Sequence, residues 1–192
     1  MDLLTKGPRR SCRSPCVKAA LAAILAMLVL VPAAVADPAA SVNPLSGTLG
    51  SGFPMVGASL PFGLIQPGPD TALPGGIEDP VNYCGYGFQD TTLRGFSLTH
   101  FDGAGITIAR DLTCTPTTGA PGFDAQQNSS PFEHATEVAQ PGYYSVALAK
   151  YSTRVELTSA LRASMARITF PQTTQANVVV DPLRSIGHAN TG

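Results

Sequence analysis

The sequence contains no tryptophan and little charge: Asp, Glu, Lys and Arg together make up 13% of its 192 residues. Its formal net charge of −1 provides no basic surplus for neutralising phosphates, so we expect no nucleic acid partner. It also contains no P-loop, no dinucleotide-binding fingerprint, no HExxH motif and no GxSxG motif. Nothing therefore indicates nucleotide-dependent, zinc-protease or α/β-hydrolase chemistry.

Long apolar runs are missing too, and this decides how the first 36 residues are interpreted. Residues 19–31 form an apolar run of 13 residues that Pro32 ends, whereas a membrane-spanning helix needs about 20. Ala34-Val35-Ala36 then gives the small-x-small pattern of a cleavage site. We predict a signal peptide over residues 1–36 and a secreted or periplasmic protein with no stable membrane anchor. The basic residues that complete this pattern are Lys6, Arg9, Arg10, Arg13 and Lys18.

Removing residues 1–36 changes the charge and the cysteine count. The segment holds five of the twelve Lys and Arg residues and one of the thirteen Asp and Glu residues. Seven bases and twelve acids remain, a net charge of −5, together with Cys84 and Cys114. An oxidising compartment allows a disulfide between these two cysteines, although sequence alone does not show whether they approach each other. Two thiols are too few for a cysteine zinc site.

The rest of the chain has the pattern of an all-β protein. Residues 37–80 are rich in Gly and Pro, which disfavour helices and favour short extended segments between turns. Apolar and polar residues then alternate with the period of half-buried strands over 144–148, 154–158 and 166–170, and Pro141-Gly142 marks a turn before the first of them. The apolar β-branched run 177–180 predicts a fourth strand. Strands spaced in this way predict an antiparallel β-sandwich over residues 37–192. Since nothing after 177–180 resembles a closing element, we expect unpaired strand edges and an incomplete domain.

The densest candidate for chemistry is the segment 83–105, in which aromatic, hydrogen-bonding and glycine residues are mixed. Such a mixture suits a sugar-binding surface, but strands with aromatic core positions and glycine bulges would have the same composition. His100 and Asp102 lie two residues apart, so on a strand they would share one face and could orient each other.

Carboxylates give no clear acid–base pair. Glycoside hydrolysis needs two carboxylates that flank the scissile bond, and the spacing of Asp70, Asp90, Asp102 and Asp111 marks no such pair. Glu133, His134 and Glu137 could bind a cation, although a solvated loop edge has the same composition.

Several segments, taken in order, resemble one known family. They are VNPLSGTLGSGFPMVGASLPFGLIQPGPDT, GFSLTHFDGAG, TPTTGA, FEHATEVAQPGYYSVAL and VELTSALRASMARITFP. The resemblance covers essentially all of residues 42–183. They are similar to successive segments of glycoside hydrolase family 92, the exported exo-α-mannosidases of bacteria.

This resemblance implies the N-terminal β-sandwich of a larger enzyme. The family's enzymes are inverting and calcium-dependent, and their catalytic carboxylates belong to a C-terminal helical domain, so the resemblance implies no catalytic residue and no assignable calcium ligand here. The sandwich contributes to the pocket for the terminal mannose, with Asp70, Tyr83, His100 and Asp102 as substrate-binding candidates. Asp102 stands where the family has Ser, and the Gly-Trp that often precedes Cys84 is missing.

Two other functions remain open. One is a free-standing secreted carbohydrate-binding protein, and the other is a truncated product with neither binding nor catalytic activity. A domain of a mannosidase needs a mannose-containing glycan and a C-terminal catalytic domain as partners. A free-standing carbohydrate-binding protein needs only the glycan.

Overall fold

The computed structural model describes residues 37–50, 52–77, 82, 84–100, 102 and 110–182. The predicted signal peptide lies outside these residues. Among the described residues there is no α-helix, and no helix is long and apolar enough to cross a membrane. The described part of the chain contains four short 3-10 helices: η1 (Pro38–Ser41), η2 (Pro74–Gly76), η3 (His134–Thr136) and η4 (Ala149–Tyr151).

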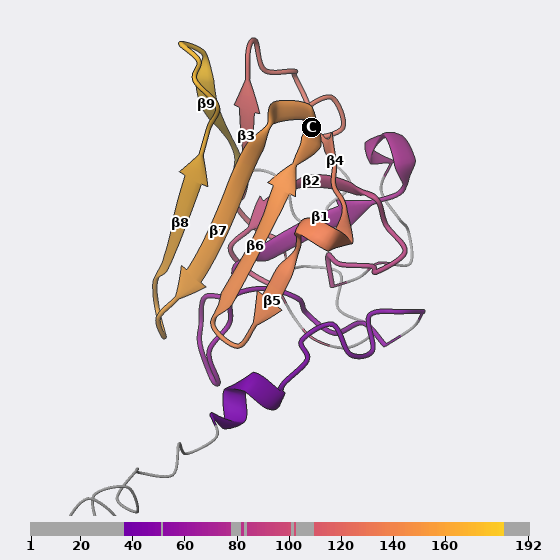
Figure 1. Ribbon diagram of the computed structural model, residues 1–192, viewed down its shortest axis with the longest axis vertical. Helices are drawn as coiled ribbons and strands as arrows, with labels where there is room; N and C mark the ends of the chain where they lie inside the picture. Colours follow the sequence, from indigo (N-terminus) through magenta and orange to yellow (C-terminus); the bar gives the residue numbers. More distant parts are fainter. Residues whose placement is uncertain are drawn as a thin grey trace, which may run out of the picture. The chain divides into compact units, whose positions relative to one another are not determined.

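In the segments that the structure describes, nine strands form two antiparallel sheets (Figure 1). The first sheet has the order β1-β2-β3-β9, with β4 also paired to β2, and the second has the order β5-β6-β7-β8. The predicted all-β fold is confirmed. The strands of the first sheet are β1 (Gly68–Ala72), β2 (Thr92–Ser97), β3 (Thr113–Thr118), β4 (Ser130–Pro131) and β9 (Ala176–Asp181), and those of the second are β5 (Val138–Gln140), β6 (Tyr143–Leu148), β7 (Thr153–Ser159) and β8 (Ser164–Thr169).

The second sheet is the part that alternation predicted best. Three of the four predicted strands correspond to its strands β6, β7 and β8, and the fourth corresponds to β9 of the first sheet. The Pro141-Gly142 turn joins β5 to β6. Gly142 has a φ of +74°, a conformation that a turn with proline before it requires and that glycine adopts without strain. The turn holds β5 and β6 in register, with Val138 opposite Ser145.

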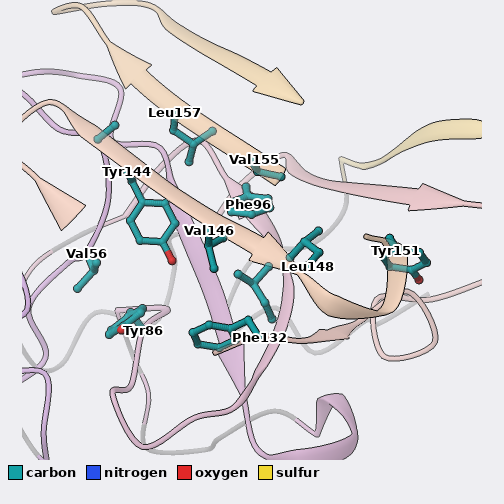
Figure 2. Packing of buried hydrophobic residues seen from close by; sticks show 12 residues of the cluster. Val56, Tyr86, Phe96, Phe132, Tyr144, Val146, Leu148, Tyr151, Val155 and Leu157 are labelled. Atoms are coloured by element: carbon teal, nitrogen blue, oxygen red, sulfur yellow. The ribbon is translucent and has the colours of Figure 1, made fainter. Parts of the chain in front are cut away.

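The hydrophobic core lies between the two sheets (Figure 2). Apolar side chains of β6 and β7 stand opposite each other, Tyr144 beside Leu157 and Val146 beside Val155. Phe96 from β2 packs against this face from the other sheet. Burying these large side chains removes apolar surface from water at about 25 cal/mol per Å² and supplies the main driving force for joining the sheets.

The sandwich is open along β8 and β9. Phe96 faces the core, and the register places Cys114 and then Val180 on the same face of their sheet. Yet Val180 is 52% exposed and Val178 44% exposed. The expectation of uncovered strand edges agrees with this exposure among the described residues.

The core predicts a sharp difference between two apolar truncations. Leu148 is 1% exposed, and replacing it with Ala leaves a cavity. Leu148→Ala should therefore lower the free energy of unfolding of the protein by about 2–5 kcal/mol. Val180→Ala, at the open edge, should cost no more than about 0.5 kcal/mol. Urea unfolding followed by far-ultraviolet circular dichroism measures both, and equal losses would show that the core has been misplaced.

Candidate functional site

A buried row of polar side chains crosses the first sheet on the face opposite the core. Asp70 on β1, Ser97 on β2 and Thr113 on β3 are all 1% exposed or less. The Ser97 hydroxyl donates to Asp70 Oδ2, and Ser97 Oγ lies 2.8 Å from Thr113 Oγ1. Because the Ser97 proton points to Asp70, Thr113 donates to Ser97. The three side chains thus form a chain of hydrogen bonds that ends at the Asp70 carboxylate.

His100 and Arg110 complete the surroundings of Asp70. His100 Nε2 lies 3.2 Å from Asp70 Oδ1, and His100 Nδ1 lies 2.9 Å from the Gln66 carbonyl oxygen. Both partners are acceptors, so this arrangement is satisfied when both ring nitrogens carry protons. Arg110 Nε lies 3.8 Å from the same Asp70 oxygen.

These neighbours keep Asp70 ionised although it is fully buried. Burial by itself raises the pKa of a carboxyl group, because it removes water from the charged form. The hydrogen bond from His100, the positive charges of His100 and Arg110, and the Ser97 hydroxyl outweigh burial and lower the pKa of Asp70 below its ordinary value. The site is therefore a buried, compensated charge cluster.

Gly85 closes over this pair. Its φ is +91°, and a Cβ added there would lie 2.8 Å from His100 Cδ2 and 3.0 Å from Asp70 Oδ1. Any larger residue would push the imidazole away from the carboxylate. The segment around Gly85 therefore packs directly on the charge cluster.

Thr71, which follows Asp70, attaches the same segment to β1. Its hydroxyl donates to Asp90 Oδ2 at 2.6 Å and accepts from the Gly87 amide at 2.8 Å, and its own amide donates to the Gly85 carbonyl at 2.6 Å. Asn82 Nδ2 also donates to Asp90, at 3.3 Å. The register of β1 shifts between Asp70 and Thr71, and the two neighbouring side chains enter different networks.

Glu137 forms a third polar cluster at the edge of the core. Its carboxylate accepts from the Tyr86 hydroxyl at 2.9 Å and the Tyr144 hydroxyl at 2.7 Å, and lies 2.8 Å from His134 Nδ1. Burial and the adjacent Glu137 charge raise the pKa of both tyrosines, so their hydroxyls stay protonated donors. The ring of Phe88 stacks on His134 with centroids 4.2 Å apart. Glu137 thus links the loop that contains Tyr86 to Tyr144 in the hydrophobic core.

The segment 133–137 shows no arrangement suited to a cation. Glu133 is exposed, and its carbonyl accepts from the Thr136 hydroxyl at 2.8 Å. Among the described residues, no group of three or more His, Cys, Asp or Glu side chains could hold a metal ion. His134 and Glu137 instead hydrogen-bond to each other, which differs from both the cation site and the solvated edge considered from sequence.

The structure brings Asp70 and His100 together but separates Asp102 from them. Asp102 Oδ1 accepts from the Met55 amide, and Asp102 is exposed. The possible pairing of His100 with Asp102 is wrong. It assumed that both residues lie on one strand and share a face, but β2 ends at Ser97, before either of them. Tyr83 lies outside the described residues.

The disulfide that the sequence left open between Cys84 and Cys114 does not form. Cys114 lies opposite Phe96 and so faces the core, whereas Cys84 precedes Gly85 in the loop on the other face of that sheet. The Cys84 thiol donates to the Phe53 carbonyl at 2.7 Å, and the two sulfurs are not joined.

Arg110 and Thr113 were missed as site residues in the sequence. For Thr113, the alternating threonines 113, 115 and 117 were the available signal.

The charge cluster predicts a specific pH dependence. Asp70→Asn should cost about 3–5 kcal/mol at pH 7, because it leaves buried positive charge uncompensated. A lowered carboxyl pKa contributes stability above the ordinary value of 3.8 and loses it as the pH falls through the folded value. The difference between wild type and Asp70→Asn should therefore narrow below pH 3.8. Denaturant unfolding at several pH values measures this, with the exposed Asp102→Asn as the control; a constant difference contradicts it.

Comparison with known proteins agrees with this architecture. The glycosyl hydrolase family 92 N-terminal domain model matches residues 41–192. A family 92 α-mannosidase from Bacteroides thetaiotaomicron, solved with mannoimidazole, is 37% identical with a TM-score of 0.70, and the match covers 77% of this chain and 20% of that one. No curated protein sequence matches.

Two further solved structures support the same assignment. A second family 92 glycosyl hydrolase is 30% identical with a TM-score of 0.68, over 78% of this chain and 21% of that one. An inverting mannosidase of the family from Bacteroides thetaiotaomicron VPI-5482 is 26% identical with a TM-score of 0.60, over 73% of this chain and 19% of that one. This chain thus spans about a fifth of the length of these solved enzymes. It belongs to glycoside hydrolase family 92, whose N-terminal domain it matches.

Proposed function

We propose that the chain serves as the N-terminal β-sandwich of a secreted α-mannosidase-like glycoside hydrolase and contributes to mannoside binding. The observation that carries this proposal is the compensated charge cluster of Asp70, His100 and Arg110, which lies directly beneath the loop at Gly85. Buried charges that are fully paired and packed against a loop are a common way to hold a binding surface rigid.

Asp70 and His100 act as positioning residues in this proposal. Both are 2% exposed or less, so they hold the Gly85 segment in place rather than meeting a sugar themselves. The substrate-binding contacts are assigned to Asp102 and Tyr83, the other two sequence candidates. Asp102 is exposed and is held through its bond to Met55.

Catalysis is assigned to the rest of such an enzyme. Hydrolysis with inversion needs one carboxylic acid and one carboxylate on opposite sides of the bond. The buried carboxylates of the described residues serve other partners: Asp70 is paired with His100, Asp90 with Thr71, and Glu137 with two tyrosines. They do not fit a calcium site either, so we place calcium, which the family resemblance implies, with the catalytic carboxylates in that remaining part.

The open edge of the sandwich supports a larger assembly. Val178 and Val180 on β9 face the core side of their sheet but stay about half exposed. Exposed apolar surface of this kind marks contacts with further protein, here the C-terminal catalytic domain that the proposal requires.

The proposal is tested by separating binding from hydrolysis. The purified chain should bind methyl α-mannoside in calorimetric titration but should not hydrolyse 4-nitrophenyl α-mannoside. His100→Gln should weaken binding about tenfold, because Asp70 loses its charged imidazole partner beneath the loop at Gly85. Glu156→Gln, on the other sheet, is the control and should bind as wild type, and thermal unfolding checks that both variants are folded.

Two outcomes would contradict the proposal. Hydrolysis by this chain alone would place catalytic carboxylates within it. Equal binding by His100→Gln and wild type would show that the charge cluster has no part in sugar recognition. The chain would then be at most a free-standing carbohydrate-binding protein that uses another surface.

A further inference from the structure

A separate cavity lies on the polar face of the first sheet, beyond Thr113. Its volume is about 240 Å³. One wall comes from β3 and β9, and the other comes from the loop between β3 and β4. The lining residues are Thr113, Thr115, Phe123, Asp124, Ala125, Asn128, Val179, Val180 and Asp181.

The loop wall is fixed by its own hydrogen bonds. The Asn128 side chain is 2% exposed, accepts from the Gly122 amide at 2.7 Å and donates to the Gly122 carbonyl at 3.1 Å. The Gln127 side chain accepts from the Phe123 amide at 3.0 Å, and the Gln127 amide donates to Asp124 Oδ1 at 2.7 Å. The loop is therefore ordered before any ligand binds, which lowers the entropic cost of binding.

The loop is also tied to the body of the domain. The Tyr151 hydroxyl donates to the Asn128 carbonyl at 3.0 Å, and Lys150 Nζ donates to the Gln127 carbonyl at 2.6 Å. Both anchoring residues belong to η4. The position of Phe123 and Asp124 relative to the sheet is thus set by contacts at the base of the loop.

Phe123 is the exposed element of this rigid loop. Its side chain is 102% exposed although it stands at the rim of a cavity. An exposed aromatic ring can stack on the C–H face of a pyranose ring, while nearby carboxylates accept hydrogen bonds from its hydroxyl groups. Asp124 and Asp181 supply carboxylates from opposite walls of the cavity, and this pair disfavours an anionic ligand.

The size of the cavity narrows the choice of ligand. Pockets for drug-sized molecules measure about 300–1,000 Å³, so a cavity of 240 Å³ suits a single small ring. We propose that it binds one neutral sugar ring, with Phe123 against the ring face and the carboxylates on its hydroxyl groups. This site is distinct from the Asp70–His100 cluster, and the proposal rests on the proposed function only in taking the ligand to be a sugar.

The two sites share one connecting element. Asp181 lies opposite Thr113 in the pairing of β3 with β9, and Thr113 is hydrogen-bonded to Ser97, which donates to Asp70. A sugar in the cavity therefore lies on the same polar face as the loop at Gly85.

Titration with methyl α-mannoside, followed by amide chemical shifts in nuclear magnetic resonance, tests the proposal on the purified chain. We expect saturable shifts at Thr115, Ala125 and Val179. Phe123→Ala should weaken binding at these resonances about fivefold, because it removes the aromatic face. Phe62→Ala is the matched control, since Phe62 is 103% exposed but does not line the cavity.

The outcomes separate this inference from the proposed function. Shifts confined to the residues around Gly85 would overturn the inference and leave the proposed function standing. Shifts at the cavity that survive His100→Gln but weaken in Phe123→Ala would support it independently. Equal effects of the two phenylalanine variants, no shift with any of methyl α-mannoside, α-glucoside and α-galactoside, or shifts produced by calcium and not by sugar would each overturn it.

Discussion

The ionised carboxylate of Asp70, buried inside the protein, is the constraint on which the arrangement of the polar face depends. A buried charge costs several kcal/mol unless partners replace its hydration. The partners come from three places in the chain: Ser97 from β2, His100 from the segment after it, and Arg110 from the approach to β3. Satisfying one charge thus fixes three separate segments against β1, and the lack of a side chain at Gly85 lets a fourth close over them.

Three buried carboxylates hold the loop that runs from Asn82 to Asp90. Asp70 lies beneath Gly85, Asp90 binds Thr71 and Asn82, and Glu137 accepts from Tyr86. Asp70 is on the polar face of the first sheet, whereas Glu137 also bonds to Tyr144 of the core. The described residues of this loop are therefore held both from the polar face and from the core.

Sequence patterns predicted the second sheet well because its strands are half-buried and their side chains alternate. Val146 and Val155 face the core, while Arg154, Glu156 and Arg167 face away and form a charged patch in which Arg167 binds Glu156 through two nitrogens at 2.6 Å. The same reasoning failed for β1, because all five of its residues are buried. Of these five, only Ala72 belongs to the hydrophobic core. Its polar residues are buried because covering loops supply hydrogen bonds, and alternation carries no information about such loops.

The sequence by itself determined the all-β class, the positions of β6 to β9, the Pro141-Gly142 turn and the family resemblance, since all of these are expressed by neighbouring residues along the chain. Asp70 and His100 were both found as candidates, but their pairing across 30 positions was not, and His100 was instead associated with Asp102. Only the tertiary structure decided which partner each polar group took and that Cys84 and Cys114 lie on opposite sides of a sheet. Hydrogen bonds and ion pairs depend on distances of about 3 Å between atoms, and these distances are set by how the sheets and loops pack rather than by spacing in the sequence.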